Sequence, residues 1–268
     1  MKAGLKATLA GLPAIVLVLA LWELLPRIGI LDPVLLPTFS TVLVRLGRLA
    51  ATGELVAHCL ASLLRVLLGF AAAALVSIPL GIALGLRPGL LNRVSPLLGI
   101  LRPISPPAWI PLAILWFGIG NRPAIFIIFA GTASAMLVGL VSGARALDTR
   151  LVQAALTLGA TRGQTVRWVA IPAMLPVIMA QLRIGLGLAW MAVIAAEMVA
   201  VRRGLGYMMV QARNLFQTDT VLAGMAVVGL LGWTLDRLLL KAERRVLCWR
   251  SDIEVHELFD PAASYKSV

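Results

Sequence analysis

The chain has 268 residues, and its 24 Lys and Arg against 12 Asp and Glu give a formal net charge of +12. Hydrophobic residues make up 60% and charged residues 13%, against roughly 45–50% and about 25% in an ordinary soluble domain. So few charges cannot cover a globule of this size with hydrated surface, which argues against a soluble enzyme and excludes a disordered chain. The composition predicts an all-α polytopic membrane protein. Its positive charge then reports orientation in the membrane rather than binding to nucleic acid.

Six stretches are long and apolar enough to cross a bilayer, which takes about 20 apolar residues in a helix. They cover residues 9–25, 58–86, 91–118, 123–140, 175–199 and 221–240. The first follows Lys2 and Lys6 and resembles a signal peptide, but no small-residue cleavage site follows, so we expect a retained helix. The third is interrupted by Pro103, Pro106 and Pro107.

Residues 27–56 and the C-terminal tail over 248–268 are more polar. Thr38 can cap a helix that runs to about Ala50 and carries Arg45 and Arg48. We expect this helix to lie along the membrane surface. The predicted organisation is an N-terminal helix and interfacial segment over 1–57, a transmembrane domain over 58–247 and an acidic cytoplasmic tail over 248–268.

The distribution of basic residues predicts the orientation. Six spans put both termini on one side of the bilayer. If that side is the cytoplasm, the cytoplasmic loops carry more Lys and Arg than the external loops, which is the usual bias. We therefore expect cytoplasmic termini, although the external loops, which contain Arg122, Arg202 and Arg203, are also basic.

Motifs for catalysis, nucleotide binding and metal binding are missing from the sequence. It contains no G-x-x-x-x-G-K-[ST], H-E-x-x-H, C-x-x-C or G-x-S-x-G, so we expect no ATP, cofactor or metal on this chain. A stand-alone secondary transporter or an intramembrane enzyme remains an alternative to a subunit of a larger transporter. A secondary transporter usually contains internal repeats, and none is evident between the two halves of the chain.

The loop between the fourth and fifth spans, residues 148–172, is too polar to cross a membrane and too long for a tight turn. Its apolar residues recur at helical spacing and predict an amphipathic helix over 149–160. Asp148 or Thr149 can cap the start of this helix, and Gly159 suits its end. The helix could dock into a groove on a soluble partner or lie on lipid headgroups.

This loop resembles the EAA loop of the type I permease subunits of bacterial ABC importers. The family pattern is Glu-Ala-Ala, three residues, Gly, nine residues and Ile-x-Leu-Pro, and it is matched here by Gln153, Ala154, Ala155, Gly159 and Pro172. Gln in place of Glu loses a charge but keeps hydrogen-bonding reach. Residues 101–120, 182–198 and 204–213 further resemble the nitrate/sulfonate/taurine branch of these permeases.

The resemblance implies a permease subunit of an ATP-driven importer in the bacterial cytoplasmic (inner) membrane. Its partners would be cytoplasmic ATPase subunits, which use the ATP, and an extracytoplasmic substrate-binding protein. Helix 149–160 would be the coupling helix seated in the ATPase. The substrate class would be a small oxyanion: a sulfonate, taurine or nitrate. We expect a homodimer, since two-fold pairing is the commonest oligomeric state.

Polar residues inside the spans are candidates for a translocation pathway, because ionisable groups are costly there unless they face an interior path or a partner. The candidates are Arg102 and Trp109 around the proline break, and Arg183 and Glu197 in the fifth span. The arginines could ease the passage of an anion. Alternatively, Arg183 or Arg102 could form a structural ion pair with Glu197.

Overall fold

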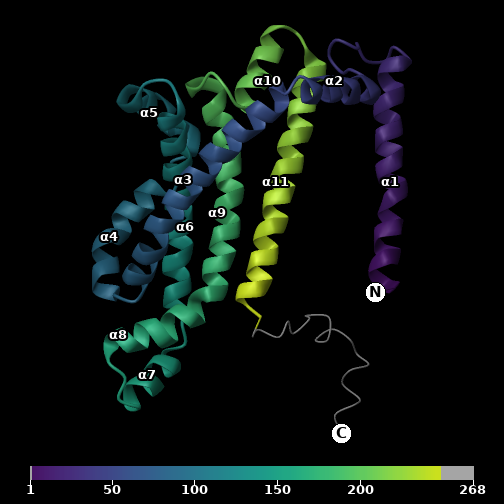
Figure 1. Ribbon diagram of the computed structural model, residues 1–268. Coiled ribbons are helices and arrows are strands. Elements are labelled where there is room, and N and C mark those ends of the chain that lie inside the picture. The colour runs from purple at the N-terminus through teal and green to yellow at the C-terminus, as the bar shows by residue number, and fades with distance from the viewer. Residues whose placement is uncertain (1, 249–268) are drawn as a thin grey trace.

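The computed structural model describes residues 2–248, and every regular element in that part of the chain is helical. The predicted all-α class is therefore confirmed. Four helical segments are long and apolar enough to cross a membrane: α3 (Glu54–Gly85), α6 (Asn121–Arg145), α9 (Ile171–Ala200) with the turns that lead into it, and α11 (Thr218–Val246). They form the bundle at the centre of Figure 1. They cover the second, fourth, fifth and sixth predicted spans.

The third predicted span is strongly bent. It consists of α4 (Pro88–Leu101), a short turn of helix η1 (Pro106–Trp109) and α5 (Ile110–Phe117), and the two halves meet at 89°. The prolines at 103, 106 and 107 lack a backbone N–H and cannot continue the helix of α4. The sequence predicted an interruption here, but the structure shows a sharp corner with α4 and α5 well separated (Figure 1).

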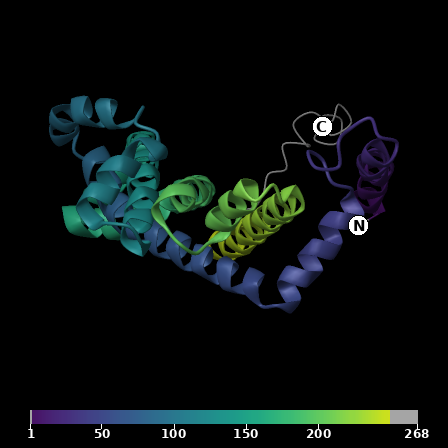
Figure 2. The ribbon, with the colours of Figure 1, turned by 90° about the horizontal axis from the view of Figure 1, so that it is seen from above.

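The N-terminal helix α1 (Lys2–Arg27) covers the first predicted span and stands apart from the bundle (Figures 1 and 2). Its end is tied to α2 (Phe39–Ala51), which crosses the end of the bundle. The Glu23 carboxylate accepts hydrogen bonds from the backbone N–H and the hydroxyl of Ser40, at 2.9 and 2.8 Å. Thr38 caps α2 through its side chain, as predicted.

Close helix contacts hold the bundle together. A Cβ atom on Gly69 of α3 would lie 2.6 Å from the Ile128 side chain of α6, and one on Gly81 would lie 2.5 Å from Leu140. Only glycine lets the two backbones approach so closely, and such packing replaces the hydrophobic driving force that is absent between helices in lipid. The α3–α6 pair is therefore a rigid frame for the rest of the bundle.

The two ends of the bundle differ in what they carry. One end carries α7 (Thr149–Thr157), α8 (Arg162–Thr165) and a π-helical turn η2 (Val166–Ala170), together with the start of α1 and the end of α11 (Figure 1). The other end carries α2, α5 and α10 (Leu205–Asn214). The domain division at residues 57 and 247 stays a prediction, and the predicted tail lies outside the described residues from residue 249 onward.

Candidate functional site

The loop between α6 and α9 forms the predicted amphipathic helix. Asp148 caps α7 by accepting a hydrogen bond from the N–H of Arg150 at 2.9 Å. The helix ends just before Gly159, whose φ of +86° is the left-handed conformation that glycine adopts most readily. Thr161 and Gln164 then form a reciprocal capping box that starts α8. Local capping thus fixes both ends of a helix of only 9 residues.

One face of α7 turns toward its own chain, and the other is open. Val152 and Leu156 line a cavity of about 630 Å³ against Ile82 and Leu86 at the end of α3. Gln153 and Ala154 are exposed, and Ala155 is half-buried.

Large apolar side chains extend this open surface beyond α7. Leu158 is 88% exposed and Trp168 is 71% exposed. Gly159 and Pro172, the other two residues of the EAA-like pattern, are also exposed. The five matching residues therefore lie at the end of the bundle that carries α7 and α8, on or beside a surface that no described residue covers.

Glu197 lies at the opposite end of the bundle in a fully buried polar cluster. Its carboxylate pairs with the Arg65 guanidinium of α3 and accepts hydrogen bonds from the Ser62 hydroxyl (2.8 Å) and the Gly206 N–H (3.0 Å). The Ser62 oxygen in turn accepts a hydrogen bond from the N–H of Leu205 at 2.9 Å. A buried charge is tolerated when it is paired and its remaining lone pairs are bonded, as they are here. The cluster ties the start of α10 to both α3 and α9.

The structural partner of Glu197 is thus Arg65, and not Arg183 or Arg102. Sequence reasoning did not select Arg65, although a carboxylate inside a span calls for a cation and Arg65 lies in the second predicted span. Ser62 precedes it by one helical turn, so both side chains lie on one face of α3. A serine and an arginine one turn apart on one helix face were therefore the sequence signal that could have identified Arg65 as the partner of Glu197.

Arg183 is also engaged, at a different place. Its Nε and Nη2 donate to the two carboxylate oxygens of Asp236 in α11, at 2.7 and 3.2 Å. Both side chains are partly exposed. Arg102 is exposed at the end of α4, and the described part of the chain offers it no salt bridge. Arg102, Arg183 and Glu197 therefore lie in three separate environments.

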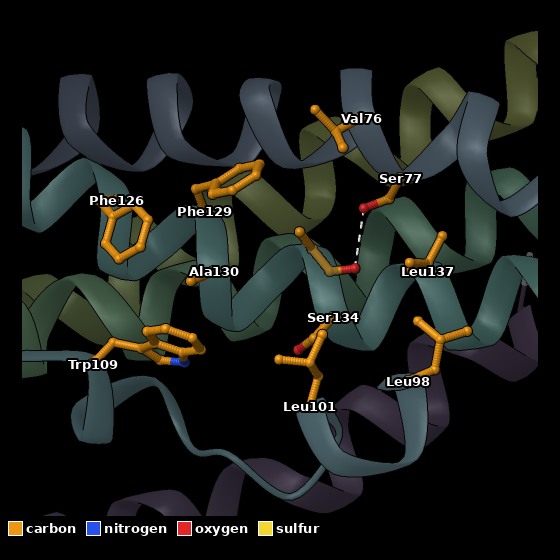
Figure 3. A pocket seen from close by; sticks show the side chains of 11 residues that line it. Val76, Ser77, Leu98, Leu101, Trp109, Phe126, Phe129, Ala130, Ser134 and Leu137 are labelled. Atoms are coloured by element: carbon orange, nitrogen blue, oxygen red, sulfur yellow. Dashed lines mark hydrogen bonds between the residues drawn. The ribbon is translucent and has the colours of Figure 1, made fainter. Parts of the chain in front are cut away.

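Trp109 lines an apolar cavity of about 280 Å³ between α3, α4 and α6 (Figure 3). Its ring meets Phe126 edge-on, with ring centres 6.0 Å apart. The two hydroxyls in the wall already donate to backbone carbonyls: Ser77 to Ala133 at 3.0 Å and Ser134 to Gly131 at 3.3 Å. The cavity can therefore contact hydrocarbon, but it has few groups with which to hold an anion tightly.

Comparison with known proteins agrees with this architecture. Residues 77–247 match the family described as "Binding-protein-dependent transport system inner membrane component". A protein of Methanocaldococcus jannaschii named as an ABC transporter permease is 42% identical over 89% of this chain and 90% of its own length. The taurine transport system permease protein TauC of Escherichia coli is 35% identical over 88% of each chain.

Further matches include a Bacillus subtilis permease named for aliphatic sulfonates and the nitrate import permease of Synechocystis, at 32% and 33% identity. The MetNI methionine ABC transporter in an inward-facing conformation matches the fold, with a TM-score of 0.60, 23% identity, and coverage of 72% of this chain and 96% of that chain. The chain therefore belongs to the binding-protein-dependent transport system inner membrane components, and it is a permease subunit of the ABC importer family.

Proposed function

We propose that this permease imports a small oxyanion, driven by a separate cytoplasmic ATPase that docks on α7 and supplied by an extracytoplasmic binding protein. The observation that carries the proposal is the open surface of α7 and its flanking turns. That surface bears the residues of the coupling pattern, Gln153, Ala154, Ala155 and Gly159, and exposes large apolar side chains outside the transmembrane bundle.

The substrate class rests on the relatives and on charge. Relatives are named for taurine, aliphatic sulfonates and nitrate, and all three substrate classes include oxyanions. A net charge of +12 favours an anion over a cation near the chain. Within the membrane, Arg102 and Trp109 are the pathway residues we retain, because Arg102 has no described salt bridge and Trp109 lines a cavity. The pairing of Arg183 with Asp236 and of Glu197 with Arg65 supports structural roles for those two residues.

The assembly follows from the same proposal. One chain would provide half of a two-fold symmetric pathway, with a second copy providing the other half. Both termini would lie in the cytoplasm, on the side of α7, and ATP would be bound by the partner ATPase while this chain binds no cofactor.

The test is uptake by proteoliposomes that contain the permease, an ATPase co-purified with it and a binding protein. We expect uptake of radiolabelled taurine, an alkanesulfonate or nitrate that needs both ATP inside and the binding protein outside. Uptake driven by an ion gradient without ATP would support a secondary transporter instead. Native mass spectrometry of the purified complex should show two permease chains, and a complex with one would overturn the dimer.

A further inference from the structure

A third cavity lies at the end of the bundle away from α7. It has a volume of about 380 Å³ and is formed by α3, the loop before α6 and the loop between α9 and α10. Ligand pockets for small molecules begin at roughly 300 Å³, so the space suits a small solute. Three arginines line it: Arg65, Arg202 and Arg203.

Arg65 presents a donor to this cavity from a buried position. The residue is only 4% exposed; its Nη1 pairs with Glu197 and its Nε donates to the Asn121 side chain at 2.9 Å. Among the described residues, Nη2 of Arg65 has no hydrogen-bond partner. It is nevertheless not a fully enclosed atom, because Thr132 Oγ1 is the one fully enclosed polar side-chain atom there that lacks a partner. Arg65 is also one of the residues that line the cavity.

The charges around the cavity are mainly positive. Arg202 and Arg203 are exposed at its rim, and α6, which begins at Asn121, points the positive end of its dipole toward it. The carboxylate of Glu197 is fully buried and already accepts three hydrogen bonds. Arginines that line one cavity offer guanidinium donors that suit the oxygens of a planar or tetrahedral oxyanion.

The two loops of the cavity are fixed in place. The N–H of Gly120 donates to the carbonyl of Ala200 at 2.8 Å, which joins the loops directly. The N–H of Gly204 donates to Nδ1 of His58 at 2.9 Å. Arg202 and Arg203 thus extend from a loop whose backbone is anchored on both sides, so little ordering of the backbone is needed when a ligand binds.

We propose that this cavity is a low-affinity oxyanion site at the outer mouth of the permease, where Arg65 Nη2, Arg202 and Arg203 receive the oxyanion group. The proposed function supplies the natural ligand, which is the imported anion, whereas the binding itself rests on the cavity alone. The affinity must be low, since an ion that binds tightly at one site on its path leaves that site slowly.

The test measures methanesulfonate binding to the permease–ATPase complex in phosphatidylcholine nanodiscs. The thermal unfolding of the complex is followed as methanesulfonate is added, and chloride keeps the ionic strength constant across the titration. We expect a saturable stabilisation. The midpoint is the methanesulfonate concentration that gives half of the full stabilisation. In the Arg202→Gln, Arg203→Gln double variant it should rise roughly tenfold, because the variant loses charge-assisted hydrogen bonds to the anion. The Arg213→Gln control, at an exposed arginine of α10 outside the cavity, leaves the midpoint unchanged.

The proposal is overturned if methanesulfonate causes no saturable rise in the unfolding temperature of the wild-type complex. It is also overturned if the double variant, like the control, has the same midpoint as the wild type. Both arginines of the double variant are exposed, so unfolding without methanesulfonate should be as in the wild type. If the double variant does not assemble, Arg203→Gln alone replaces it, with an increase in the midpoint of roughly threefold as the expected result.

Two further arms separate the sources of the oxyanion and the two proposals. In nanodiscs that contain phosphatidylglycerol, an unchanged midpoint supports a free anion. If phosphatidylglycerol raises the midpoint only when Arg202 and Arg203 are intact, the cavity binds a lipid headgroup and the proposed role at the outer mouth is overturned. ATP-driven sulfonate uptake with wild-type binding in the double variant overturns this inference alone. Methanesulfonate binding without any ATP-driven anion uptake overturns the proposed function alone.

Discussion

The two ends of this permease are stabilised in opposite ways. At the end that carries α10, polar groups are buried and mutually bonded, with Arg65, Ser62 and the N–H of Gly206 gathered around one carboxylate. At the end that carries α7, the hydrogen bonds are local caps and the large apolar side chains Leu158 and Trp168 are exposed. The polar cluster of the first end is satisfied within one chain. The second presents surface that a partner would have to cover.

This difference separates residues that hold the fold from residues available for contact. A helix as short as α7 is not stable by itself in water, so it depends on its caps and on its packing against α8 and η2. A partner bound to the open face could therefore displace α7 with little disturbance of the bundle. The cluster around Glu197, in contrast, joins three helices and cannot move without breaking several bonds at once.

The largest effect on stability is expected for Glu197→Ala, which leaves the Arg65 guanidinium buried without its counter-charge. Breaking a buried ion pair in this way typically costs about 3–5 kcal/mol. Thermal or denaturant unfolding of the purified permease measures the loss. The control is Glu197→Met combined with Arg65→Met, which removes both charges and should recover part of the stability. A double variant no more stable than the single one would contradict a paired role.

At the opposite end, Ala154→Arg should leave the fold intact and damage coupling. Ala154 is exposed, so a longer side chain fits in the isolated permease. In a complex it would bury an unpaired charge, which costs several kcal/mol, and each ~1.4 kcal/mol weakens association tenfold. We expect ATPase co-purification and uptake to fall by on the order of tenfold or more at unchanged permease stability.

Thr157→Arg is the matched control for coupling, because it adds the same charge at the last residue of α7. A position-specific docking face predicts a weaker effect there than at Ala154. The partner-docking role of α7 is contradicted if Ala154→Arg keeps normal uptake and normal substrate-stimulated ATPase activity.

The backbone at Gly204, beside the polar cluster around Glu197, is also sensitive to substitution. Gly204 has a φ of +146°, and a Cβ atom there would lie 2.5 Å from Glu197 Oε2. Gly204→Ala should therefore destabilise the permease by roughly 1–3 kcal/mol, the usual cost of such strain. Gly187→Ala is the control, because that glycine lies within α9 and its Cβ would meet nothing within 4 Å. Equal unfolding temperatures for the two variants would contradict the expected strain.

Local features of the chain were predictable from sequence because their causes are local. The cap at Asp148, the end of α7 before Gly159 and the break at Pro103 depend on neighbouring residues alone. The partner of Glu197 was not predictable in the same way. Arg65 lies 132 residues away, and only the tertiary packing of α3 on α9 decides that it, and not Arg183 in the same helix as Glu197, reaches the carboxylate. The 89° corner between α4 and α5 likewise depends on packing against α6.

The smallest effect is expected for Arg183→Gln, which tests whether this arginine belongs to the pathway or to the frame. Its bidentate pair with Asp236 is partly exposed, so neither group is enclosed in a buried network as Glu197 is. If the pair is structural, Arg183→Gln and Asp236→Asn each lower the unfolding temperature slightly and by similar amounts. The double variant then loses no more than either single one, because both changes remove the same interaction. Uptake falls only in proportion to the permease that remains folded. Arg237→Gln is the control, since the neighbouring Arg237 lies over the Trp233 ring. If uptake collapses in Arg183→Gln while the unfolding temperature holds and Asp236→Asn transports normally, Arg183 acts on the anion and the structural assignment is wrong.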